Sequence, residues 1–401
     1  MGSHRNVCDH RNHQLYCRTS GAQTTHAMKK VCLFNYPPMD DFHGYHIENF
    51  DPLAYFPKGS RWPFTDLIIW GLNGWDQRRA LTAGAAGVDR LYRERNPHYM
   101  RMIGDFVDRF RDFDLIVMSS YNFIHPEVLA RELKKPIKVL GFIDDPLSTY
   151  LRGIPYLWAF DGAFFISPGY IDNQPFDEAI QRWGNKPAMW WPLVPFPFSR
   201  PENADESFFR QRDMDVVYVG NPSASKVERL IRLKRHFGDR MRVHGRWPFK
   251  GYTGFVRGIF GKPIYPHRVT SLTNQQRTQL YWRTKIGFNM HVSDHPYETG
   301  NMRMYETPAH GMLMVCDKAA ANTHAGIFEP DIEAVYYDSV NEAIDLIEYY
   351  LAHDEERIRI AQAGYVRSWQ DYQWESNLLR FMDWASSIQR THQTVLEGRQ
   401  P

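Results

Sequence analysis

A chain of 401 residues is longer than one ordinary domain, and its 43% hydrophobic and 23% charged residues are typical of a globular protein. A formal net charge of only +2 excludes a strong overall attraction to nucleic acid. The four cysteines are scattered without a CxxC or CxxH spacing, which argues against a disulfide framework and a structural zinc site and favours a cytoplasmic setting.

The N-terminal segment is polar and rich in histidine, and an apolar run begins only after Met28. We expect residues 1–27 to be a disordered extension, either native or left from cloning, and Met28 to be the functional start. The sequence shows no secretory signal and no run of about 18 apolar residues that would span a bilayer. The predicted location is therefore cytoplasmic, with peripheral membrane association as the alternative.

The N-terminal half, residues 28–200, alternates short apolar runs with stretches of helical period. This alternation is typical of βαβ units and predicts a parallel sheet with helices on both faces. The strand-like runs are 31–36, 66–71, 114–120, 137–146 and 162–167, and the clearest helices are 96–113 and 126–134.

The segment 188–203 is rich in proline and aromatic residues and is predicted to be a linker. A second alternating series then predicts another domain over 204–372. Its predicted strands are 215–221, 241–245, 285–290, 312–317 and 335–337, and its helices are 226–237, 274–284, 305–311, 340–352 and 355–369. The predicted fold class is α/β, with two Rossmann-like doubly wound domains that face each other across a cleft. In such folds ligands bind at the carboxyl ends of the strands.

One loop of the second domain contains the most candidate ligand-binding residues. Seven residues separate Glu298 from Glu306, and among them are Gly300, Asn301 and Arg303. A glycine-containing loop before a helix offers free N–H groups and the positive end of the helix dipole, which suit a diphosphate. Glu306, predicted at the start of the helix, is suited to accept two ribose hydroxyls, and Arg303 to bind a phosphate. On spacing alone, a surface carboxylate at 298 and a capping role for Glu306 are equally open.

The runs KIGFNMH and NMRMYETPAHGMLMVCD, and the helical stretch after them, follow one another over residues 285–368. Together they resemble the C-terminal domain of CgeB-like glycosyltransferases, which are related to retaining GT-B enzymes with a Glu-x7-Glu motif. The resemblance implies a GT-B fold with a donor nucleoside diphosphate at Asn-x-Arg-x-x-Glu, Glu306 at the ribose and Glu298 near the sugar or phosphates. It also implies that a helix within 373–401 crosses back to the N-terminal domain before a short tail.

Two other strand ends of the second domain supply donor-site candidates. The first is a turn of small residues that allows phosphate to approach closely, although it is no Walker loop. The second resembles the family's Gly-x-Trp stretch, near which the nucleobase is expected. The candidate residues at these two ends are Gly220, Asn221, Lys226, His244, Arg246 and Trp247.

The N-terminal half supplies the catalytic and acceptor-side candidates, which we expect at carboxyl ends of strands. The acceptor-side candidates are Asp41, His43 and His46, and the catalytic candidates are His125, Asp144 and Asp145, together with Glu298 of the second domain. Related transferases often have a histidine where this chain has the paired aspartates. A carboxylate there can orient or deprotonate an acceptor hydroxyl, and capping of the next helix is the alternative.

Residues 240–292 contain ten Lys or Arg and no Asp or Glu, with aromatic residues between the cations. Such a stretch suits peripheral contact with anionic lipid or with nucleic acid. The alternative is a solvated face whose charge is balanced elsewhere in the fold, which the small net charge favours.

The sequence therefore predicts a glycosyltransferase that moves a sugar from a nucleoside diphosphate sugar, with a UDP-sugar favoured, to an unidentified acceptor. The resemblance favours retention of anomeric configuration. No essential metal is expected, because we recognise no Asp-x-Asp tripeptide of the kind that metal-dependent transferases use. No cofactor is expected either, because the nucleotide-sugar is itself a substrate. The alternatives are a nucleotide-sugar epimerase of GT-B fold and a non-catalytic nucleotide-sugar-binding or scaffold protein.

Overall fold

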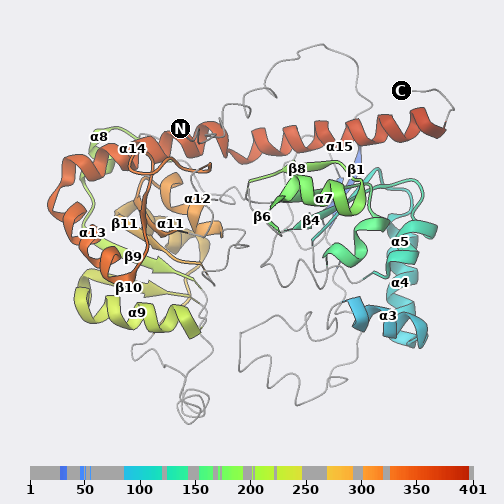
Figure 1. Ribbon diagram of the computed structural model, residues 1–401, viewed down its shortest axis with the longest axis horizontal. Coiled ribbons are helices and arrows are strands. Elements are labelled where there is room, and N and C mark those ends of the chain that lie inside the picture. The colour runs from blue at the N-terminus through green and yellow to red at the C-terminus, as the bar shows by residue number, and fades with distance from the viewer. Residues whose placement is uncertain are drawn as a thin grey trace, which may run out of the picture.

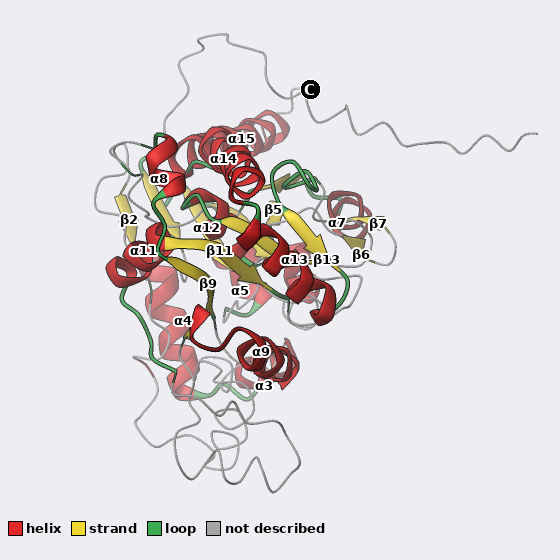
Figure 2. Ribbon diagram, turned by 90° about the vertical axis from the view of Figure 1, so that its left-hand side faces the viewer, coloured by secondary structure: helices red, strands yellow, loops and turns green. Residues whose placement is uncertain are grey.

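A computed structural model describes residues 28–33, 46–48, 50, 55, 85–119, 124–142, 153–165, 170–171, 174–192, 201, 204–220, 224–245, 269–291, 301–318 and 326–396. Within these residues the chain forms two parallel sheets, each flanked by helices (Figures 1 and 2). One sheet comes from the N-terminal half and the other from the C-terminal half. The predicted α/β fold with two doubly wound domains is confirmed.

The described strands of the N-terminal sheet lie in the order β2-β1-β3-β4-β5-β8 and are all parallel. All six residues of the central strand β4 are buried, as expected for a strand covered on both faces. The strands are β1 (Lys30–Leu33), β2 (His46–Glu48), β3 (Leu115–Ser119), β4 (Ile137–Phe142), β5 (Gly162–Phe165) and β8 (Ala188–Trp190). The helices are α3 (Ala85–Arg93), α4 (Pro97–Phe110), α5 (Pro126–Glu132), the 3-10 helix η4 (Ile154–Ala159) and α7 (Phe176–Gly184), and a small antiparallel pair joins β6 (Tyr170–Ile171) to β7 (Gln174–Pro175).

Strand β8 corrects the predicted linker. Ala188 pairs with Ala163 and Trp190 with Phe165, so the first three residues of the segment 188–203 extend the sheet beyond β5. Three residues are too few to show an alternating pattern, and a proline at position 192 makes the run read as a loop. An edge strand needs ladder hydrogen bonds on one side only, so this short run is sufficient.

The described strands of the C-terminal sheet lie in the order β10-β9-β11-β12-β13, again all parallel. The strands are β9 (Met214–Val219), β10 (Met241–His244), β11 (Thr284–Asn289), β12 (Leu313–Asp317) and β13 (Val335–Tyr337). The helices are α8 (Glu206–Arg210), α9 (Ala224–Phe237), the 3-10 turn η5 (Gly238–Arg240), α11 (Asn274–Arg283), α12 (Met302–Ala309), α13 (Val340–Ala352) and α14 (Asp354–Asp371).

The last described helix, α15 (Trp374–Leu396), joins the two halves. It follows α14 and runs along the top of Figure 1 from the C-terminal half across the N-terminal one. Its buried residues belong to the same hydrophobic cluster as Val31 and Val117 of the N-terminal sheet. Phe381 stacks on Trp191 with ring centroids 4.0 Å apart and planes 20° apart. The end of the chain thus covers one face of the sheet with which the fold begins.

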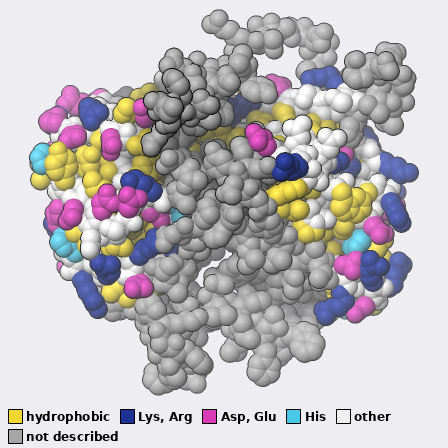
Figure 3. All heavy atoms as spheres, viewed as in Figure 1, with side chains coloured by type: hydrophobic (Ala, Val, Ile, Leu, Met, Phe, Trp, Pro, Cys, Tyr) yellow, Lys and Arg dark blue, Asp and Glu magenta, His cyan; other side chains and the backbone are white. Residues whose placement is uncertain are grey.

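Neither sign of charge dominates among the described residues on the face that Figure 3 draws. On the face drawn in Figure 3, Lys and Arg side chains lie among Asp and Glu side chains on both halves. None of the helices in the described part of the chain has the length and apolarity needed to cross a bilayer. The domain limits at 28–200 and 204–372 and the extension over 1–27 stay predictions.

Candidate functional site

The C-terminal sheet reverses its winding between β9 and β11. The chain passes from β9 to β10 on one side and then returns to β11 on the other side of β9. Loops diverge at such a switch point, and the carboxyl ends of its two strands are where open α/β sheets bind ligands. Gly220 follows β9 directly, and Met290 and His291 follow β11.

Arg303 spans this switch point. Its Nη1 donates to the carbonyl of Val219 at 2.9 Å, and its Nη2 donates to the carbonyl of Met290 at 3.2 Å. Its Nε donates to Asn289 Oδ1 at 2.9 Å. With the described residues alone, these bonds use three of the five guanidinium N–H groups, which leaves one on each Nη. The side chain predicted to bind a phosphate therefore also ties together the ends of β9 and β11.

Gly220 makes room for this arrangement. A Cβ added to Gly220 would lie 2.0 Å from Arg303 Nη1 and 2.8 Å from the Tyr218 hydroxyl. The Arg303 guanidinium also lies over the Tyr218 ring, 4.7 Å from its centroid. The glycine at the end of β9, predicted to allow close approach of a phosphate, allows close approach of the arginine.

Helix α12 begins three residues earlier than the sequence predicted. Asn301 caps it by accepting the N–H of Arg303 at 3.0 Å, and its Nδ2 donates to the carbonyl of Met290 at 3.3 Å. The cap therefore fixes the amino end of α12 beside the end of β11, where its free N–H groups and dipole favour an anion. Glu306 lies in the second turn, so the prediction that it opens the helix is wrong. The sequence argument missed that asparagine is a strong N-cap residue.

Glu306 is buried, with 2% of its surface exposed, and faces α11. Arg277 Nη1 lies 3.2 Å from one carboxylate oxygen, and the Tyr281 hydroxyl donates to the other at 3.4 Å. Burial raises the pKa of Glu306, while the charges of Arg277 and Arg303 and the Tyr281 bond act in the opposite direction. An ionised carboxylate has about four lone-pair sites, so these two partners leave it able to accept further hydroxyls.

His310 is the C-cap residue of the same helix. Its Nδ1 lies 2.6 Å from the main-chain carbonyl of Glu306, and burial lowers its pKa to about 3. A neutral imidazole with Nδ1 as the donor fits this contact. The turn that carries Glu306 is thus held by side chains on both sides.

Two more predicted donor-site residues lie at the same edge of the sheet. His244 ends β10, its carbonyl accepts the N–H of Gly220 at 2.9 Å, and its Nδ1 lies 3.2 Å from Thr270 Oγ1. Burial lowers the pKa of His244. Lys226 lies buried in the first turn of α9. The structure therefore brings Gly220, His244, Lys226 and the α12 residues to neighbouring carboxyl ends of one sheet.

The sequence reasoning missed a buried ionic group at this edge. Asp317, at the end of β12, accepts the main-chain N–H of His291, at 3.1 and 3.0 Å, and lies 2.7 Å from His291 Nδ1. Arg229 Nη1 lies 3.2 Å from its other oxygen. The position of both residues at ends of predicted strands was the available signal. This group ties β11 to β12 as Arg303 ties β9 to β11.

Ligand atoms of His291, Cys316 and Asp317 lie within 4.8 Å of one another, which is a spacing that metal sites show. The surroundings do not suit a cation, however. Arg229 already neutralises Asp317, and burial raises the pKa of the Cys316 thiol well above its ordinary value. A metal requires the thiolate form of a cysteine ligand. The cluster is better explained as a structural ion pair.

The expectation that the chain lacks an Asp-x-Asp tripeptide is wrong, because one is present. It consists of Asp213 and Asp215 around Met214, at the amino end of β9. Asp213 pairs with Arg283, while Asp215 Oδ2 lies 2.9 Å from Arg240 Nε. Both carboxylates therefore lie at the end of the sheet opposite to the switch point and are engaged by arginines.

His125 has the geometry of a structural residue. Its Nδ1 accepts the N–H of Glu127 at 3.3 Å and so caps α5, and its Nε2 lies 3.3 Å from Asp89 Oδ1. The ring stacks on Tyr92 with centroids 4.0 Å apart and is only 4% exposed. Both ring nitrogens have protein partners, which does not support the predicted role toward substrate.

His46 was expected at the carboxyl end of a strand, and the topology corrects this. It begins β2 and pairs in parallel register with Lys30, the first residue of β1. It therefore lies at the amino end of the sheet, away from the edge where ligands bind. The prediction placed His46 in the loop that follows the first strand, whereas strand β2 already begins at this residue.

Several predicted residues lie outside the described part of the chain, and their roles stay predictions. They are Asp41, His43, Asp144, Asp145, Asn221, Arg246, Trp247, Glu298 and Gly300. Residues 246–268, the centre of the basic stretch, lie there too.

Comparisons with known proteins bear on the fold of the chain. Residues 225–383 match a protein family described as glycosyl transferase-like, and no curated protein matches the sequence. Sucrose-phosphate synthase from Thermosynechococcus elongatus superposes with a TM-score of 0.55 at 12% identity, over 92% of this chain and 100% of that one. HepE of Anabaena, solved with UDP-glucose, gives 0.53 at 13% identity, over 89% of this chain and 99% of its own. TarM gives 0.48 at 12% identity over 71% of this chain, which spans 57% of TarM. The first two likenesses show the GT-B fold.

Proposed function

We propose that the protein transfers a sugar from a nucleoside diphosphate sugar, with a UDP-sugar as donor, to an acceptor bound between the two domains. The observation that carries the proposal is the position of α12. Its amino end, Arg303 and Glu306 lie at the switch point of the C-terminal sheet, inside the segment that matches the glycosyl transferase-like family. The complex of HepE with UDP-glucose supports the choice of UDP.

The site has the parts that such a reaction needs. The free N–H groups of α12 and the remaining N–H groups of Arg303 would stabilise the charge that develops on the leaving diphosphate. Glu306, held between Arg277 and Tyr281, would accept the ribose hydroxyls. Closure of the domains would exclude water, which otherwise hydrolyses the donor. We further propose that the reaction retains the anomeric configuration, as the resemblance to Glu-x7-Glu enzymes implies. We also propose that it needs no metal, because the Asp-x-Asp carboxylates Asp213 and Asp215 are engaged by arginines at the opposite end of the sheet.

The first test is calorimetric titration of the full chain with UDP, GDP, dTDP, ADP and CMP. We expect UDP to bind, and Glu306→Gln to weaken binding about tenfold or more, because a charge-assisted hydrogen bond contributes about 1.5–3 kcal/mol. Asp345→Asn, on the exposed side of α13, is the control and should leave the affinity unchanged. Absence of nucleotide binding by the wild type would overturn the proposal.

Incubation with UDP-glucose then separates the alternatives. Transfer or slow hydrolysis with release of UDP supports a transferase. Formation of an isomeric nucleotide-sugar without any acceptor would indicate an epimerase. Binding without either product, across a panel of UDP-sugars and acceptors, would indicate a non-catalytic binding protein.

A further inference from the structure

Two neighbouring tryptophans at the end of β8 face different partners. Trp191 stacks on Phe381 of α15, as described above. Trp190 packs against the hydrophobic cluster of the N-terminal domain and also against the cluster formed by α12, β12 and Tyr372 in the C-terminal domain. Consecutive side chains of an extended chain point to opposite sides, which explains the division. Trp190 therefore contacts the cores of both domains.

The contact of Trp190 with the C-terminal domain is specific. Its ring lies edge-on to Tyr372, with centroids 6.1 Å apart and planes 63° apart. Its indole is hydrogen-bonded to the Tyr305 hydroxyl. Because an indole N–H can only donate, Tyr305 is the acceptor in this bond. Tyr305 also packs edge-on to Tyr372, at 5.2 Å and 82°, and is 1% exposed.

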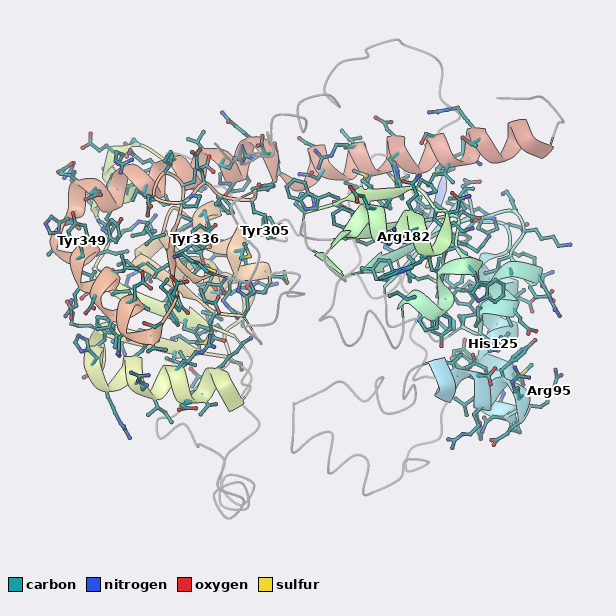
Figure 4. All side chains as sticks on the ribbon, in the orientation of Figure 1. Arg95, His125, Arg182, Tyr305, Tyr336 and Tyr349 are labelled. Atoms are coloured by element: carbon teal, nitrogen blue, oxygen red, sulfur yellow. The ribbon has the colours of Figure 1, made fainter. Side chains whose placement is uncertain are left out.

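Tyr305 belongs to the helix that carries the candidate donor site. It lies two residues after Arg303 and directly before Glu306 in α12. At about 100° per residue these three side chains leave the helix in different directions. Arg303 reaches the strand ends, Glu306 reaches α11, and Tyr305 lies on the side of the C-terminal domain that faces the N-terminal one (Figure 4). The N-terminal domain thus supplies one of the contacts that hold α12 in place.

We propose that Trp190 is a positioning residue for the donor site, acting through Tyr305 on the orientation of α12. The inference rests on the proposed function, since it assigns Arg303 and Glu306 to the donor. A change in the angle between the domains that breaks the Trp190–Tyr305 bond deprives a buried hydroxyl of its donor and releases one side of α12. The affinity for the donor nucleotide is then coupled to the arrangement of the two domains.

The test compares Trp190→Phe, which keeps an aromatic ring but removes the N–H donor, with Tyr305→Phe, which removes the acceptor. We expect each to weaken UDP binding by about three- to tenfold, the effect of one hydrogen bond. The double variant should bind UDP as either single variant does, because both changes break the same bond. Hydrogen exchange of the α12 amides should become faster in all three variants.

Tyr336→Phe is the matched control. Its hydroxyl donates to the carbonyl of Phe328 at 3.0 Å within the same cluster but makes its bond inside the C-terminal domain. It should lower the melting temperature without changing the UDP affinity. If Trp190→Phe and Tyr305→Phe behave like this control, the positioning role is wrong and the contact is structural only. If the wild type binds no nucleotide, the proposed function fails, whereas wild-type binding with unchanged variants refutes only this inference.

Discussion

At the scale of single residues, Glu306 shows how neighbours set the state of a buried carboxyl group. Burial disfavours the ionised form of the carboxyl group. Arg277 at 3.2 Å and the Tyr281 hydroxyl at 3.4 Å favour the ionised form and so offset part of this effect. The net pKa is raised above the ordinary 4.5. The folded protein therefore holds this proton more tightly than the unfolded chain. The contribution of Glu306 to the free energy of unfolding therefore falls as the pH rises from 4.5 through the pKa of the folded protein.

This raised pKa predicts the pH dependence of nucleotide binding. If the ionised carboxylate accepts the ribose hydroxyls, the UDP affinity should fall as the pH drops through the pKa of Glu306. In Arg277→Met the cation is lost, so the pKa should rise further and the midpoint should move to higher pH. Calorimetric titrations between pH 4.5 and 8 measure both midpoints. A midpoint that is the same in the two proteins would mean that another group titrates.

Two other residues show which side-chain roles the sequence does not reveal. The sequence predicted that Arg303 meets a phosphate, and the structure adds three bonds to the protein itself. It likewise predicted that His125 faces substrate, and the structure places it as a helix cap. The partners of Arg303 could not be predicted, because they lie at the ends of β9 and β11, whereas the cap made by His125 is local to α5.

At the scale of elements, the ends of three neighbouring strands are joined by charged side chains. Arg303 links β9 to β11, and Asp317 links β11 to β12 while Arg229 reaches it from α9. Without such links, the last carbonyl and amide groups of each strand would be exposed to the site. The links therefore keep the switch-point edge in one geometry, as an electrostatically preorganised site requires.

Asp317→Asn tests this account. The change leaves Arg229 and the His291 amide without the carboxylate, so we expect the free energy of unfolding to fall by about 3 kcal/mol. Asp338 pairs with Lys318 in an exposed position, with side chains 65% and 49% exposed, and Asp338→Asn should cost less than about 0.5 kcal/mol. Urea denaturation of both variants and the wild type gives the comparison. Equal small losses would show that the buried group is not a structural link.

The elements themselves were predictable to different degrees. Long apolar runs such as β4 and long amphipathic helices such as α13 and α14 lie where the sequence predicts them, because each repeats its pattern over many residues. The three-residue strand β8 has no room for a pattern and was read as a linker. The predicted start of helix α12 was too late because Asn301 was not recognised as its N-cap. The switch point itself depends on strand order, which no local pattern contains.

At the scale of the whole molecule, the C-terminal helix belongs by contact to the N-terminal domain. Phe381 of α15 is fully buried, stacked on Trp191 and edge-on to Phe164, with centroids 5.6 Å apart in the second pair. The same cluster contains Met28 and Val31, from the first described residues. Folding of the N-terminal sheet is therefore complete only after the last part of the chain has been added.

Phe381→Ala should accordingly destabilise the domain that is distant in sequence. Removal of the ring from a fully buried site costs about 3–5 kcal/mol. Amide exchange should become faster in β1, β3 and β5, which lie under α15, while β9, β11 and β12 keep their protection. Leu379→Ala, at a position 45% exposed on the same helix, is the control and should change neither set. Faster exchange in both sheets of Phe381→Ala would show that the domains unfold as one unit, and faster exchange in the C-terminal sheet alone would contradict the assignment of α15 to the N-terminal domain.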